Sequence, residues 1–83
     1  MMLIRNQSGT SLMNFSNITV IYAVDKAIKV FFSTEKFDFD VIGIYSSEEK
    51  AISVLNQIQD TYEFIMTQKE YFTFQMPQDS EVE

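Results

Sequence analysis

The residues best suited to chemistry are carboxylates in the middle of the chain. Asp38 and Asp40 alternate with apolar residues, and Asp25 and Glu35 precede them. Carboxylates bind Ca²⁺ or Mg²⁺, and a pair of them can act as acid and base in glycoside hydrolysis. However, no Ca²⁺-binding loop is present, and a half-exposed strand produces the same alternation. We therefore expect no catalytic residue and no metal, with a cation on Asp38 and Asp40 as the alternative.

Other catalytic residue types are missing. The 83 residues include no histidine and no cysteine. This excludes an imidazole base, a cysteine nucleophile and a thiolate metal site. The two glycines, Gly9 and Gly43, lie far apart, so no glycine-rich phosphate loop is formed. We expect a non-enzymatic protein without cofactors.

The basic residues point weakly to nucleic acid. Lys26, Lys29 and Lys36 are expected near one sheet edge beside Phe31, which combines positive charge with an aromatic ring. The net charge is nevertheless −6, and three of the twelve carboxylates lie in the last five residues. A regulator that binds nucleic acid or a nucleic-acid-processing enzyme is therefore the alternative hypothesis.

The hydrophobic content favours protein binding instead. Apolar residues make up 46% of the chain and aromatic residues 14%, whereas a domain of this size removes only roughly 60–65% of its surface from water. Uncovered apolar patches usually mark interfaces, most simply between two copies. We predict a homodimer, unless the last strand covers these residues internally. The predicted interface residues lie off the expected core faces: Phe31, Ile42, Ile44, Ile52, Val54 and Tyr71.

One segment, residues 45–62, has the pattern of an amphipathic helix. Ser46 and Glu49 fit a capping box at its start. Apolar residues then recur at steps of four and three, which places them on one face. We expect the helix to continue to about residue 66 and to bury the following stripe: Ala51, Leu55, Ile58, Tyr62 and Ile65.

Strand patterns surround this helix. They cover residues 2–6, 12–15, 18–24, 27–32, 37–41 and 71–76. In the fifth strand, Phe37, Phe39 and Val41 are expected to face inward. Beyond Val41 the apolar residues change parity, which indicates either a bulge near Gly43 or a strand end buried on both faces.

These elements predict a single α+β domain over residues 1–77. It would contain an antiparallel meander of about four to five strands, one long helix on one face, and a C-terminal strand. That last strand would pair within the chain or swap into a second copy. Residues 78–83 are expected to form a disordered acidic tail. With no apolar run of ~18 residues and no secretory signal, we expect a cytoplasmic protein that does not enter a membrane.

Several short segments match a known group of proteins. They are Leu3-Ile4-Arg5-Asn6-Gln7, Leu12-Met13-Asn14 with Asn17, and Gly43-Ile44-Tyr45-Ser46-Ser47-Glu48-Glu49, then Ala51, Val54-Leu55, Ile58-Gln59, Tyr71 and Met76-Pro77. Through them the chain resembles small uncharacterised proteins of Gram-positive bacteria, their phages and mobile elements. The run from Phe31 to Phe39 is more aromatic than in that group. The resemblance implies an intracellular bacterial or phage origin but no activity, ligand or catalytic residue.

Overall fold

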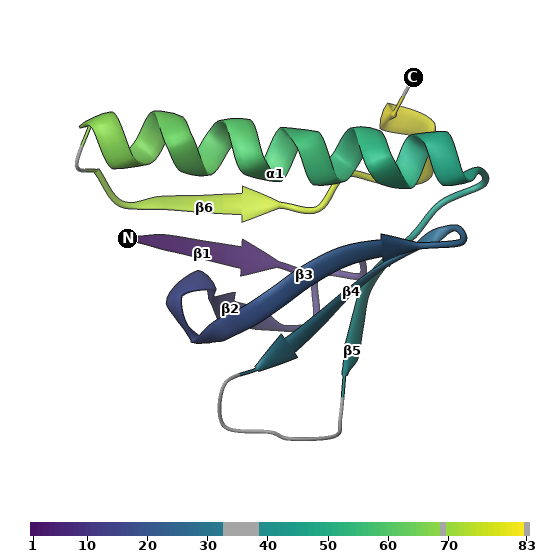
Figure 1. The fold of residues 1–83 in the computed structure, drawn as a ribbon, viewed down its shortest axis with the longest axis horizontal. Helices are drawn as coiled ribbons and strands as arrows, with labels where there is room; N and C mark the ends of the chain where they lie inside the picture. The colour runs from purple at the N-terminus through teal and green to yellow at the C-terminus, as the bar shows by residue number, and fades with distance from the viewer. Residues whose placement is uncertain (33–38, 69, 83) are drawn as a thin grey trace.

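Alternating apolar residues build two small sheets, and one long helix packs beside them (Figure 1). The computed structural model describes residues 1–32, 39–68 and 70–82. The elements are β1 (Met2–Arg5), β2 (Leu12–Asn14), the 3₁₀ helix η1 (Phe15–Asn17), β3 (Ile18–Val24), β4 (Ala27–Phe32), β5 (Asp40–Ile44), α1 (Glu48–Gln68), β6 (Phe72–Gln75) and the 3₁₀ helix η2 (Asp79–Glu81). The predicted α+β class is confirmed.

The described strands form two three-stranded sheets, ordered β2-β1-β6 and β3-β4-β5. Neighbours are antiparallel except for β6, which runs parallel to β1, with Met2 opposite Phe72. The final strand therefore pairs within its own chain. It is parallel to β1 because α1 carries the chain back to the side where β1 begins (Figure 1).

Of the two alternatives for the strand end near Gly43, a bulge or burial on both faces, the structure has the bulge. Ile28 pairs with Gly43 while Lys29 pairs with Val41, so Ile42 is an extra residue on β5. Ile42 is buried, whereas Val41 and Phe39 are 42% and 46% exposed. The prediction that Phe39 and Val41 face inward is therefore wrong.

Gly43 is needed at the bulge because the Tyr45 ring lies against its backbone. A Cβ at this position would lie 3.0 Å from the Cε2 and hydroxyl oxygen of Tyr45 and 3.1 Å from Cε of Met76. Any larger side chain would displace a residue that is fully buried in the core. Phe37 and Asp38, which were expected to begin this strand, lie outside the described residues.

The helix begins one residue later than the capping box predicts. Ser47, not Ser46, caps it: its Oγ accepts the Lys50 N–H at 3.2 Å. Glu49 therefore lies at the second helical position and cannot complete the box, although it and Glu48 still complement the positive end of the helix dipole. No helix in the described part of the chain is long and apolar enough to cross a membrane.

The core is one cluster between the helix and both sheets. On α1, Ala51, Val54, Ile58 and Ile65 are buried, while Leu55 is half-buried and Tyr62 is 37% exposed. The predicted stripe is thus rotated slightly toward Val54. The complete cluster is Met2, Ile4, Met13, Ile28, Val30, Ile42, Tyr45, Ala51, Val54, Ile58, Ile65, Phe74, Met76 and Val82.

The C-terminal segment differs from the predicted disordered tail. Residues 79–81 form η2, where Gln78 N–H donates to the Glu81 carboxylate at 2.7 Å. Val82 is only 4% exposed, because η2 folds back and inserts this side chain into the core. The prediction followed the acidic composition of this segment and missed Val82, the apolar residue that packs it against the core.

A pair of isoleucines on α1 tests this packing. Ile58→Ala should lower the free energy of unfolding by about 2–5 kcal/mol, because it leaves a cavity where Ile58 is 1% exposed. Ile52→Ala, at a 44% exposed position on the same helix, should change it by about 0.5 kcal/mol or less. Urea unfolding followed by circular dichroism measures both. Equal effects would contradict the assigned helix face.

Candidate interaction surface

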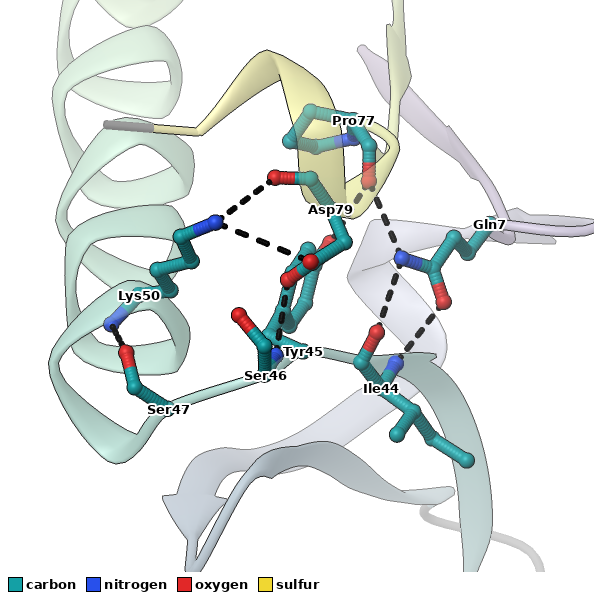
Figure 2. A network of polar contacts seen from close by, with 8 residues as sticks. All are labelled: Gln7, Ile44, Tyr45, Ser46, Ser47, Lys50, Pro77 and Asp79. Atoms are coloured by element: carbon teal, nitrogen blue, oxygen red, sulfur yellow. Dashed lines mark hydrogen bonds and ion pairs between the residues drawn. The ribbon is translucent and has the colours of Figure 1, made fainter.

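A polar network at the end of β5 is the first candidate for chemistry (Figure 2). The Gln7 side chain accepts the Ile44 N–H at 2.8 Å and donates to the Ile44 and Pro77 carbonyl oxygens at 3.0 and 3.3 Å. The Gln7 backbone N–H also donates to the Ile42 carbonyl oxygen at 2.8 Å. Gln7 thereby extends β1 to β5 and joins the two sheets.

Tyr45 and Asp79 complete this network. The Tyr45 hydroxyl donates to the Pro77 carbonyl oxygen at 2.9 Å. Burial, with the nearby negative charges of Asp79 and Glu81, raises the pKa of Tyr45 to about 12. Asp79 accepts the Ser46 N–H at 2.7 Å, which, with the Lys50 ammonium 3.6 Å away, lowers the pKa of its carboxyl group. The network thus joins η2 to the start of α1.

This arrangement holds the chain together. The Tyr45 hydroxyl donates its hydrogen bond to a carbonyl oxygen. The Asp79 carboxylate accepts one from Ser46 and forms an ion pair with Lys50. In the described residues, no buried side-chain nitrogen or oxygen lacks a hydrogen-bond partner. The network therefore leaves no buried polar atom aimed at a ligand.

Only part of the alternative carboxylate site lies in the described residues, which include Asp25 and Asp40. Asp25 lies in the turn beside the end of β5 and Asp40 at its start, because Ala27 pairs with Ile44 and Val30 with Asp40. Glu35 and Asp38 lie outside the described residues. Among those described, no group of three or more metal-ligating side chains of the His, Cys, Asp or Glu types is found.

The outer face of sheet β3-β4-β5 carries an aromatic row. The Tyr22 and Phe31 rings stack with centroids 5.9 Å apart, and Phe31 meets Phe39 edge-on at 6.1 Å. Lys29 Nζ lies 4.4 Å from the centre of the Phe39 ring. This face is apolar, with one lysine held against it.

An apolar hollow of about 410 Å³ lies between β3 and α1, and we call it the α1–β3 groove. Its lining comes from η1, β3 and one face of α1: Phe15, Ile21, Leu55, Ile58, Gln59 and Tyr62. The Phe15 and Tyr62 rings pack 4.9 Å apart. They also line a second hollow of about 240 Å³ with Met1, Ile65 and Met66. The two hollows meet at Phe15 and Tyr62, and only the α1–β3 groove is lined by a residue of β3.

The predicted interface residues are not brought together. Ile42 and Val54 are 2% and 0% exposed, so their assignment to the surface is wrong: the bulge turns Ile42 inward, and Val54 belongs to the buried helix stripe. Of the remaining four, Phe31 and Ile44 belong to sheet β3-β4-β5, Ile52 to α1, and Tyr71 to the segment before β6.

The groove residues were not predicted. Phe15 lies where the sequence predicts a strand end, and Tyr62 was assigned to the core. The missed signal is the Asn14-Phe15-Ser16 turn, in which Asn14 Oδ1 accepts the Ser16 N–H at 3.0 Å and starts η1. This turn places Phe15 against the helix.

Comparisons with protein-family models, with curated proteins and with solved structures find no match for this chain. The functional argument therefore rests on the surfaces described above.

The network predicts a loss of stability at high pH. The pKa of Tyr45 is raised in the folded state, so its stabilisation is complete below pH 10 and is lost as pH rises from 10 to about 12. Tyr45→Phe should be less stable than the wild type at pH 8, because the bond to Pro77 is gone, and the difference should shrink above pH 10. Urea unfolding between pH 8 and 11.5 measures it, with Tyr71→Phe, at an 84% exposed position, as the control. A constant difference would contradict the role of Tyr45.

Proposed function

We propose that this protein is a non-enzymatic interaction module that binds protein, most simply a second copy of itself, through the α1–β3 groove. The single observation that carries the proposal is the groove itself: an apolar hollow next to a strand that nothing covers in the described residues. A second copy offers the same apolar surface in return.

The size and shape of the groove fit side chains of a partner protein. Two aromatic and three aliphatic residues form its walls: Phe15, Tyr62, Ile21, Leu55 and Ile58. Such apolar hollows usually accept an anchoring side chain at the centre of an interface. The one polar lining residue, Gln59, is exposed, and its side chain donates to the Glu63 carboxylate at 3.2 Å.

Light scattering during size-exclusion chromatography of the full chain tests this proposal. The wild type should show a mass near twice 9.7 kDa at high concentration and should dissociate on dilution. Leu55→Glu, which puts a charge in the groove, should weaken the dimer by about tenfold or more. Ile52→Glu, on the same helix but outside the groove, is the matched control.

Circular dichroism and thermal melts must show that both variants fold. Should Leu55→Glu unfold, Tyr62→Gln tests the same groove at a more exposed position. A wild type that stays monomeric at all concentrations would overturn self-association, and equal behaviour of the position 55 and 52 variants would overturn the groove.

A second candidate function is binding of single-stranded nucleic acid. It is favoured by the row of Tyr22, Phe31 and Phe39 with Lys29 on one sheet face, since such proteins stack bases on aromatic rings and contact phosphates with cations. It ranks second because the net charge of −6 repels the phosphate backbone.

Fluorescence anisotropy of a labelled single-stranded oligonucleotide tests this candidate. Binding through the row should weaken steeply as salt is raised from 50 to 200 mM, by about tenfold or more for a few phosphate contacts. Lys29→Gln should reduce both the affinity and the salt dependence, whereas Lys50→Gln, whose side chain is held by Asp79, should not. No binding at low salt excludes this function.

A further inference from the structure

We infer that two copies join by pairing β3 with β3, in antiparallel fashion, into one six-stranded sheet. This inference rests on the proposed self-association and identifies the atoms that carry it. β3 is an end strand of sheet β3-β4-β5, so one of its two edges has no neighbouring strand in the described residues.

The sequence of β3 lacks the protection that edge strands usually have. Its seven residues, Ile-Thr-Val-Ile-Tyr-Ala-Val, include no lysine, no carboxylate and no proline. Natural proteins block exposed edges with such residues, because a free edge otherwise pairs with another chain. β3 is also the longest described strand and has no fully buried residue. An apolar strand without edge protection is suited to pairing.

The hairpin geometry shows which backbone groups face the open edge. Val24 pairs with Ala27 across a two-residue turn whose first residue, Asp25, has φ 53°. In such a turn the closing pair is hydrogen-bonded, and the bonds then alternate along the strand. Tyr22 and Val24 therefore direct their N–H and C=O groups to β4, whereas Ile21 and Ala23 direct theirs to the open edge.

No bond outside the β3–β4 ladder occupies these groups. Among the backbone hydrogen bonds found between described elements, none involves Ile21 or Ala23, and none of the side-chain bonds does either. An antiparallel second β3 supplies donors and acceptors in the same alternation. Each strand then satisfies the other about a two-fold axis.

The α1–β3 groove explains where the partner's side chains go. Ile21 lines the groove from the inner face of β3, next to Leu55 and Ile58 of α1. A strand added beside β3 carries its own inner-face residues over the same hollow. The apolar side chain of Ile21 from the second copy suits this apolar hollow. By symmetry, Ile21 of the first copy enters the groove of the second.

Charge makes β3 a better meeting point for two copies than the exposed helix surface. The chain carries −6 overall, and α1 exposes Glu48, Glu49, Asp60 and Glu63. Contact between two such helix surfaces brings carboxylates together, which opposes dimerisation. β3 has no charged side chain, so two β3 edges approach without like charges in either strand.

A matched pair of valines tests the inference. Val20 on β3 and Val41 on β5 are 47% and 42% exposed, and both lie on the outer face of the sheet, on opposite edge strands. Val20→Lys places a lysine in each of the two paired β3 strands and should raise the dimer dissociation constant by about tenfold or more. Val41→Lys, two strands away, should leave it unchanged. Thermal melts confirm that both variants fold.

Amide hydrogen exchange of the wild type gives a measurement independent of any variant. The amides of Ile21 and Ala23 should exchange about tenfold or more slowly at concentrations where the dimer forms than after dilution, because pairing protects them. Those of Tyr22 and Val24, already bonded to β4, should change less.

The outcomes separate the two proposals. A monomer at every concentration overturns both self-association and strand pairing. A dimer that Val41→Lys also dissociates, or in which the Ile21 and Ala23 amides are not protected, overturns strand pairing while self-association stands. A dimer that is lost only in Val20→Lys, and in which the Ile21 and Ala23 amides are protected, supports the pairing of β3 with β3.

Discussion

The structure depends on the burial of one stripe of α1 against both sheets. Ala51, Val54 and Ile58 are each no more than 1% exposed, and they contact strands from both halves of the chain. A domain of 83 residues has apolar material for one core only. One helix must therefore cover two sheets, and in its C-terminal half Tyr62 stays partly exposed to solvent. The α1–β3 groove is the consequence of this limited coverage.

The second constraint is the connection between the sheets. Gln7 forms hydrogen bonds to Ile44 that imitate a paired strand, and it also holds the Pro77 carbonyl group. The Tyr45 ring occupies the space left by the missing side chain of Gly43, where its hydroxyl reaches Pro77. These contacts place the C-terminal segment against the start of α1. The polar contacts of this network stabilise the fold, whereas the α1–β3 groove is lined mainly by apolar side chains.

The local patterns in the sequence were sufficient to predict the helix, most of its buried stripe and most strands, and they reduced the strand end near Gly43 to two alternatives, one of them the observed bulge. These features depend on periodicity within a few residues. The parallel pairing of β6 joins residues 70 apart, and Gln7 reaches Ile44 and Pro77, which lie 37 and 70 residues further along the chain. The inward turn of Val82 likewise depends on a core built from distant segments. Periodicity within a few residues does not encode such contacts. The surface assignment of Ile42 was wrong for another reason: a one-residue bulge exchanged the faces of Ile42 and Val41.

The pairing of β1 with β6 has a consequence for biosynthesis. One edge of β1 (residues 2–5) is paired only after residues 72–75 have been made. The contacts that complete the fold therefore span nearly the entire sequence. Such long-range closure slows folding relative to proteins built from local contacts. Until residues 72–75 have left the ribosome, the edge of β1 that they fill stays open. During that interval the nascent chain exposes an unpaired strand edge to chaperones and to aggregation.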